Sequence, residues 1–277
     1  MEGYANPDAL VDTDWLGEHL EDPRVRVIEV DEDVSAYDKG HIPGAVRWQW
    51  FSDLHNPIRR DLVDQDGLEQ LLSRSGVGAD DIVVLYGGNN NWFATYAYWL
   101  LKYLGFDNLK LLNGGRQKWE LESRPLTAEV PAVQETSHPI SQPVRRELRA
   151  HREEVLQSLG RASFVDVRSP EEYRGEKLAP EQLPQEAAQV AGHIPGALNI
   201  TWSVAANEDG TFKSADQLRE IYGDVDTSTK VVTYCRIGER SSHTWFVLRE
   251  LLGVGQIKNY DGSWTEYGSL VGAPVER

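Results

Sequence analysis

Cys235 is the only cysteine of the chain, and strongly charged residues surround it. It follows the apolar, β-branched run 231–232, and Arg236 and Arg240 come shortly after it. At the junction of a strand, a tight loop and a helix, a thiol faces unpaired backbone N–H groups and the positive end of the helix dipole. These groups and the two guanidinium groups favour the thiolate. A lone cysteine often packs as an inert hydrophobic residue, but the arginines favour a nucleophile with a lowered pKa.

Short apolar runs alternate with helical patterns along the chain. The first half predicts strands at 25–30, 81–86 and 109–112 and a helix at 92–104, and the second half predicts strands at 163–167, 230–234 and 256–259 and a helix at 242–252. This alternation predicts βαβ units, in which helices cover both faces of a parallel sheet. Ligands of such sheets bind beyond the carboxyl ends of the strands, which is where Cys235 lies.

The two halves repeat one set of motifs. The matching pairs are GHIPGA at 40–45 and 192–197, VVLYG at 83–87 and VVTYC at 231–235, and LNGG at 112–115 and YDGS at 260–263. Their common order and nearly constant spacing indicate a tandem repeat. We expect an N-terminal domain at 1–128, a proline-containing linker at 129–145 and a C-terminal domain at 146–277. A loop packed over both domains is the alternative reading of the linker.

The two copies differ at the position of the thiol. Gly87 aligns with Cys235, and the residues after it, 89–91, are neutral asparagines. The first copy therefore lacks a nucleophile. The second copy carries an insertion between Tyr173 and Gly192, with Arg174 near its start. This insertion is either a substrate-binding or lid segment or a surface loop without a role.

Several motifs together resemble the rhodanese family of sulfurtransferases over nearly the whole chain. They are YDKGHIPGA at 37–45, DVRSPEEY at 166–173, GHIPGA at 192–197, CRIGERS at 235–241 and YDGSWTEY at 260–267. The resemblance implies an α/β fold of two tandem rhodanese-like domains, each a parallel sheet flanked by helices. It also implies that the first domain is inactive and the second catalytic.

The resemblance is strongest to thiosulfate sulfurtransferases. It implies that sulfane sulfur passes from thiosulfate to cyanide or a thiol through a Cys235 persulfide, without a cofactor. Arg236, Arg240 and, by a looser alignment, Arg174 would bind the anionic end of the donor. Loop residues Ile237, Gly238 and Glu239 would complete the donor site, and Glu239 would either tune the thiol pKa or orient Arg240.

Other activities remain open. A 3-mercaptopyruvate sulfurtransferase has small neutral residues after the cysteine, which the arginines here do not match. A sulfur carrier would hand its persulfide to a protein acceptor. A cysteine phosphatase has arginine six positions after the cysteine, where this chain has Ser241.

Composition excludes several classes of partner. A net charge of −16 disfavours nucleic acid, because phosphate binding needs a basic face. No Cys/His cluster suggests a metal, and no apolar run reaches the length of about 18 residues that a membrane helix needs. The N-terminal sequence does not resemble a secretion signal. We therefore expect a cytoplasmic enzyme whose partners are a small sulfur donor and a thiophilic acceptor.

Overall fold

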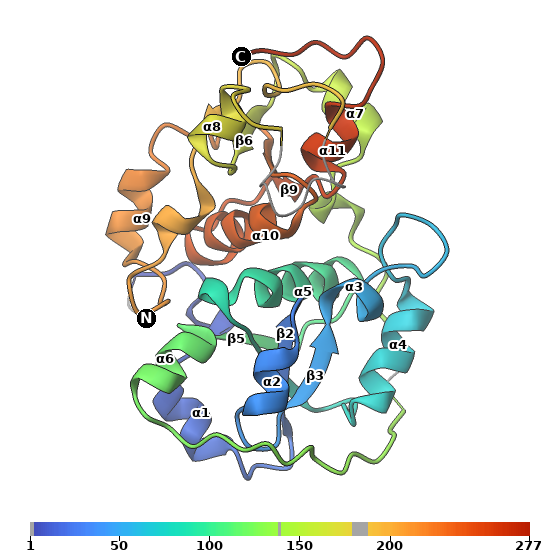
Figure 1. Ribbon diagram of the computed structural model, residues 1–277, viewed down its shortest axis with the longest axis vertical. Coiled ribbons are helices and arrows are strands. Elements are labelled where there is room, and N and C mark those ends of the chain that lie inside the picture. The colour runs from blue at the N-terminus through green and yellow to red at the C-terminus, as the bar shows by residue number, and fades with distance from the viewer. Residues whose placement is uncertain (1–2, 138–139, 179–187) are drawn as a thin grey trace. The chain divides into compact units, whose positions relative to one another are not determined.

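The computed structural model describes residues 3–137, 140–178 and 188–277. Its contacts divide the chain into two units (Figure 1). The N-terminal unit comprises Asp8–Arg145 and Ala206–Phe212, and the C-terminal unit comprises Met1–Pro7, Arg146–Ala205 and Lys213–Arg277. Each unit thus includes a short segment from the other half of the sequence.

The N-terminal unit contains a parallel sheet of five strands in the order β1-β5-β4-β2-β3. The strands are β1 (Leu10–Val11), β2 (Val25–Asp31), β3 (Val46–Gln49), β4 (Ile82–Tyr86) and β5 (Leu109–Leu112). The α-helices are α1 (Thr13–His19), α2 (Ser35–Lys39), α3 (Trp50–Asp53), α4 (Gln65–Arg74), α5 (Trp92–Tyr103) and α6 (Gly115–Leu121). Helix α5 packs on β2, β4 and β5. Leu16 of α1, Tyr37 of α2 and Trp119 of α6 share a core with β-strand residues such as Val84. Both faces of the sheet are therefore covered, as the sequence predicts.

The C-terminal unit repeats this design with four parallel strands in the order β7-β6-β8-β9. The strands are β6 (Ser163–Asp166), β7 (Leu198–Asn199), β8 (Val231–Tyr234) and β9 (Ile257–Asn259). The α-helices are α7 (Arg152–Gln157), α8 (Pro170–Tyr173), α9 (Ala215–Ile221), α10 (Glu239–Phe246) and α11 (Ser263–Tyr267). Helix α10 packs on β8 and β9, and Val155 of α7 and Trp264 of α11 share a core with Tyr234. The predicted α/β class with helix-flanked parallel sheets is confirmed.

The helix predicted at 242–252 differs from the observed one in its start and in its last turns. Helix α10 begins at Glu239, and after Phe246 the chain forms a π-helical segment, η6 (Val247–Leu251). The N-terminal segment of the chain lies against this part of the C-terminal unit: Ala5 N donates to Leu251 O at 2.9 Å, and Asn6 Nδ2 donates to Glu250 Oε2 at 2.6 Å. Because α10 starts earlier than predicted, the loop after Cys235 is very short.

The segment 129–145, which the sequence suggests as a linker, is bonded to the N-terminal unit. Thr136 Oγ1 donates to Val77 O at 2.6 Å, and Arg145 N donates to Tyr103 O at 2.7 Å. Half of the predicted insertion, residues 179–187, lies outside the described residues.

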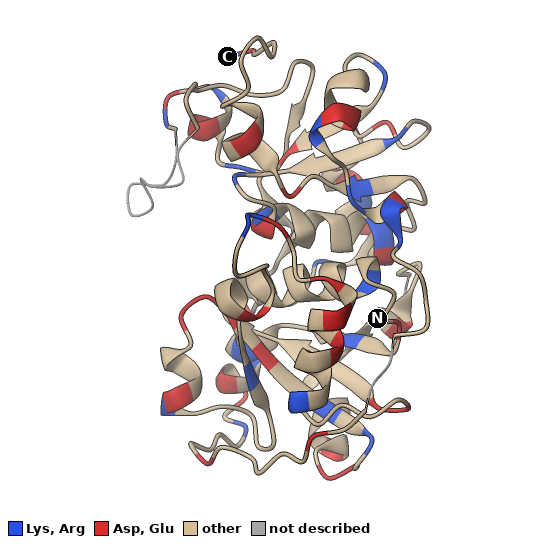
Figure 2. Cartoon of the chain, turned by 90° about the vertical axis from the view of Figure 1, so that its right-hand side faces the viewer, with Lys and Arg blue, Asp and Glu red and all other residues tan. Residues whose placement is uncertain are grey.

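The described part of the chain contains no helix long and apolar enough to cross a membrane. It also contains no cluster of His, Cys, Asp and Glu suited to hold a metal ion. In the view of Figure 2, basic residues are interspersed with acidic ones along the chain.

Candidate active site

Strand β8 ends at Tyr234, so Cys235 is the first residue beyond its carboxyl end. Cys235 N donates to Ser263 Oγ at 3.0 Å, which ties the start of the loop to α11. The Cys235 side chain is fully buried. The thiol thus lies where parallel sheets bind their ligands, as the sequence predicts.

Gly238 turns the loop back toward the sulfur. It is the N-cap of α10, and its φ of 95° lies in the left-handed region that favours glycine. Its backbone N lies 3.2 Å from Cys235 Sγ and donates to it. A Cβ at this position would lie 2.6 Å from Asp261 Cα, so no side chain fits. Gly238 therefore supplies one N–H group to the sulfur and a turn that only glycine permits.

The carboxylate of Glu239 faces the thiol. Cys235 Sγ donates to Glu239 Oε2 at 3.1 Å, and Ile237 N donates to the same oxygen at 3.3 Å. The other oxygen, Oε1, lies 3.5 Å from Arg236 Nη2 and 3.7 Å from Arg240 Nε. The structure therefore brings five predicted site residues together around Cys235: Arg236, Ile237, Gly238, Glu239 and Arg240.

The electrostatic setting of the thiol differs from the prediction. Burial raises the pKa of Cys235, and the negative charge of Glu239 raises it further, whereas Arg240 opposes them. The expectation of a lowered thiol pKa is wrong for this state of the loop. Burial and the neighbouring carboxylate of Glu239 explain why the thiol pKa is raised. The sequence motif does not show where that carboxylate points.

Arg240 is held by a residue that sequence reasoning missed. Its Nη1 and Nη2 donate to Glu172 Oε2 and Oε1 at 2.9 and 3.1 Å. Burial acts to raise the pKa of Glu172, but Arg240 and the bond from Ser169 N leave it lowered. Glu172 also belongs to a capping box with Ser169 at the start of α8. The Ser-x-x-Glu pattern signals that cap, although it does not indicate an arginine partner.

Arg174 lies apart from this arrangement. Its Nε and Nη2 donate to Glu176 at 2.7 and 3.1 Å, and half of its side chain is exposed. Its role as a donor ligand stays a prediction.

The equivalent loop of the N-terminal unit has no room for a thiol. A Cβ at Gly87 would lie 2.5 Å from Val30 O. Asn89, Asn90 and Asn91 all have positive φ, so this loop follows a different path from that of the loop 235–240. Beside it, Gly88 N donates to Asp31 Oδ2 at 2.9 Å, and burial raises the pKa of Asp31 to about 7.

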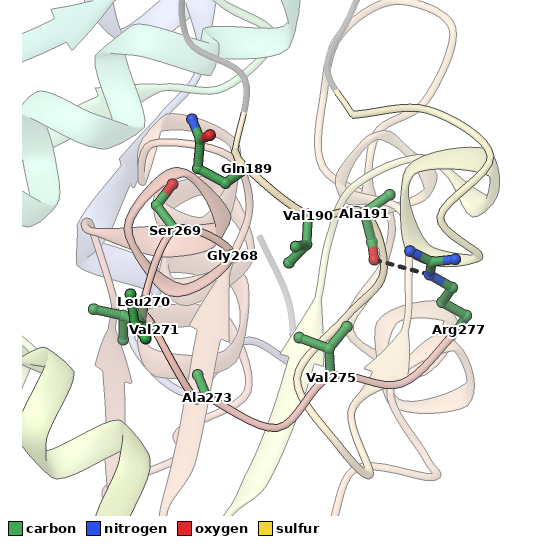
Figure 3. A pocket seen from close by; sticks show the side chains of 11 residues that line it. Gln189, Val190, Ala191, Gly268, Ser269, Leu270, Val271, Ala273, Val275 and Arg277 are labelled. Carbon is green, nitrogen blue, oxygen red and sulfur yellow. Dashed lines mark hydrogen bonds between the residues drawn. The ribbon is translucent and has the colours of Figure 1, made fainter.

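A surface pocket lies elsewhere in the C-terminal unit (Figure 3). Its lining includes the apolar side chains of Val190, Val271 and Val275, and Arg277 Nε donates to Ala191 O at 3.2 Å beside them. None of its lining residues belongs to the loop 235–240.

Comparison with protein families identifies the family of the chain. The model of the rhodanese-like domain matches the chain twice, at residues 12–122 and 151–270. The chain belongs to the rhodanese family. The two matches agree with the repeat seen in the sequence and with the two α/β units of the fold.

Curated relatives match nearly the whole length of the rhodanese chain. A protein of Saccharopolyspora erythraea named "Putative thiosulfate sulfurtransferase" is 57% identical over 271 residues, which cover 97% of this chain and 96% of the relative. A protein of Mycolicibacterium smegmatis with the same name is 57% identical over 274 residues, with 98% and 99% covered. The sulfur carrier protein TtuD of Thermus thermophilus is 52% identical over 283 residues, with 99% of each chain covered.

Solved structures of lower identity share the fold. The crystal structure of YnjE has a TM-score of 0.87 at 25% identity, covering 99% of this chain and 69% of that one. The anaerobic ergothioneine biosynthesis enzyme of Chlorobium limicola, in complex with trimethyl histidine, has a TM-score of 0.84 at 25% identity, with 100% and 72% covered.

Proposed function

We propose that this chain, a sulfurtransferase of the rhodanese family, takes the outer sulfur of thiosulfate and passes it to cyanide or a thiol through a persulfide on Cys235. The observation that carries the proposal is the loop itself: Gly238 N–H points at the sulfur, and Arg236 and Arg240 lie beside Glu239, which contacts the thiol. The names of the relatives from S. erythraea and M. smegmatis support thiosulfate as the donor.

In the first half-reaction, the Cys235 thiolate attacks the outer sulfur of thiosulfate. A new S–S bond forms, the bond between the two thiosulfate sulfurs breaks, and sulfite leaves with the electron pair. The Gly238 N–H group stabilises the negative charge on the sulfur of the attacking thiolate. Arg236 and Arg240 hold the anionic end of the donor, Arg240 through its Nε because its Nη1 and Nη2 are bonded to Glu172. Arg174 is proposed as a third ligand of the donor.

In the second half-reaction, a thiophilic acceptor attacks the outer sulfur of the persulfide. The bond between the two sulfurs breaks, and Cys235 becomes a thiolate again. The N-terminal unit supplies no nucleophile, because Gly87 stands where a thiol would be needed and the Val30 carbonyl blocks a side chain there.

Two alternatives concern the partners of the same thiol. TtuD, named a sulfur carrier, supports a protein as a further acceptor of the persulfide sulfur. With 3-mercaptopyruvate as donor, the site would bind a carboxylate of lower charge. The two buried guanidinium groups favour the more highly charged thiosulfate.

A paired assay tests the choice of donor. Initial rates are measured for one preparation with thiosulfate and with 3-mercaptopyruvate, each with cyanide as acceptor. We expect the higher kcat/KM with thiosulfate and no activity of Cys235→Ser with either donor. A higher kcat/KM with 3-mercaptopyruvate would overturn the proposed donor while keeping the nucleophile.

A further inference from the structure

The carboxylate of Glu239 lies where the proton of the thiol must go. The Sγ–Oε2 separation is 3.1 Å, with the thiol as donor. The side chain is 1% exposed. Within the described part of the chain, Glu239 Oε1 has no hydrogen-bond donor. Glu239 is therefore a buried carboxylate in contact with the nucleophile, with one oxygen still able to accept.

The charges around the thiol favour an internal proton transfer. Arg236 and Arg240 contribute two positive charges, and Glu172 and Glu239 contribute two negative ones. If the Cys235 proton left for solvent, this buried site would gain a net negative charge, which desolvation disfavours. If the proton moved to Glu239, the nucleophile would form with the total charge of the site unchanged.

We propose that Glu239 is the base that accepts the Cys235 proton. The proposal rests on the persulfide mechanism above. The S–H bond breaks as an O–H bond forms at Oε2, which leaves a thiolate beside a neutral carboxylic acid. The proton stays on Oε2 while sulfite leaves and the persulfide anion persists. It returns to Cys235 after the acceptor has removed the outer sulfur.

The other charged groups near Glu239 are already paired. Arg240 of α10 is bonded through two nitrogens to Glu172 of α8. Behind Gly238, Asp261 is bonded to Arg149 at 2.8 Å through both of its oxygens. On the loop itself, Arg236 Nη2 lies 3.5 Å from Oε1. Neither Glu172 nor Asp261 contacts the thiol, so Glu239 is the carboxylate positioned to accept its proton.

The rate of attack on the donor distinguishes a base at Glu239 from a carboxylate that only suppresses ionisation of the thiol. If the carboxylate only kept the thiol neutral, its removal would ease ionisation and speed attack on the donor. As a base, its removal slows the attack. Glu239→Gln keeps the size of the side chain but cannot accept the proton, and Glu239→Asp keeps a carboxylate on a shorter stem.

The test measures single-turnover persulfide formation on the full chain with thiosulfate, by quenching at set times and intact mass, across pH. We expect Glu239→Gln to be slower near neutral pH by about 10²-fold. Its rate should rise about tenfold per pH unit, because the thiol must then ionise to solvent. The wild type should be nearly flat over the same range, and Glu239→Asp should recover part of the rate. A Glu239→Gln enzyme as fast as the wild type, or faster, at every pH overturns the proposal.

A second readout separates this proposal from the proposed function. Because Cys235 is the only cysteine, its alkylation by iodoacetamide reports this thiol alone and needs no sulfur donor. We expect the alkylation rate of the wild type to be nearly flat with pH and that of Glu239→Gln to rise with pH. Wild-type enzyme that forms no persulfide would overturn the sulfurtransferase mechanism, whereas identical alkylation profiles would overturn only the role of Glu239.

Discussion

Gly238→Ala tests whether the left-handed turn of the loop creates the reactive thiol. Gly238 has a φ of 95°, and an added Cβ would lie 2.6 Å from Asp261 Cα and 2.8 Å from Asp261 Cβ. Its carbonyl accepts from Ser241 Oγ and Asn259 Nδ2, both at 3.1 Å. Because Asp261 contributes backbone atoms to this contact, Gly238 must move, and its N–H group moves away from Cys235 Sγ.

Two effects lower the free energy of unfolding of Gly238→Ala. A left-handed conformation costs a residue with a Cβ about 1–2 kcal/mol, and overpacking costs about 1–3 kcal/mol more. We therefore expect the free energy of unfolding to fall by about 2–5 kcal/mol. Loss of a hydrogen bond to a charged sulfur, about 1.5–3 kcal/mol, should slow persulfide formation by about ten- to a hundredfold.

Gly160→Ala is the matched control. Its φ of 69° is also left-handed, but no atom lies within 4 Å of an added Cβ. The free energy of unfolding of Gly160→Ala should fall only by the conformational cost of about 1–2 kcal/mol. Its rate of persulfide formation should equal that of the wild type. Both quantities come from denaturant unfolding and from intact mass after thiosulfate treatment. If Gly238→Ala matched Gly160→Ala in both stability and rate, the reasoning about the loop would be refuted.

Three further predictions concern charge, the silent unit and pH. Arg236→Gly should lower kcat/KM for thiosulfate by about ten- to a hundredfold and affect 3-mercaptopyruvate less; equal losses would show that Arg236 does not select the donor. Gly87→Cys combined with Cys235→Ser should form no persulfide by intact mass, because its Cβ would lie 2.5 Å from Val30 O; a persulfide there would contradict the assignment of a silent unit. Burial raises the pKa of Asp31 from 3.8 to about 7, so the folded state binds this proton more tightly and the free energy of unfolding falls as pH rises from 4 to 7. Asp31→Asn should remove up to about 4 kcal/mol of that fall, and an unchanged pH slope in urea unfolding would contradict it.

The repeat and the main strands were predictable because buried parallel strands read as continuous apolar runs. Strand β5 has the bounds that the sequence predicts, and β4, β8 and β9 each differ by one residue at the start. Strands β1, β3 and β7 were missed. Strands β1 and β7 have only two residues each and carry no periodic signal, and β3, with the sequence VRWQ, is not a continuous apolar run.

His41 and His193 occupy the same position of the repeated GHIPGA motif. Their presence in both copies favours a structural role. His41 stacks on Tyr37 with ring centroids 3.7 Å apart, and His193 stacks on Tyr173 at 3.6 Å. Both rings also bond the backbone carbonyl of the tyrosine that they cover.

The candidate site was predictable only where its residues are neighbours in the chain. Arg236, Gly238 and Glu239 are placed by the loop that the motif defines. Glu172 and Ser263 reach the loop from α8 and α11, and no local pattern indicates which residue they contact. The direction of the thiol pKa shift was also out of reach, because it depends on burial and on where a carboxylate points.

The most direct test of the account is the intact mass of the protein after treatment with thiosulfate. The account predicts a species heavier by one sulfur atom, reversed by cyanide and absent in Cys235→Ser, which should also have lost turnover. A serine variant that transferred sulfur at the wild-type rate, or wild-type protein that turned over without ever gaining the sulfur atom, would contradict it.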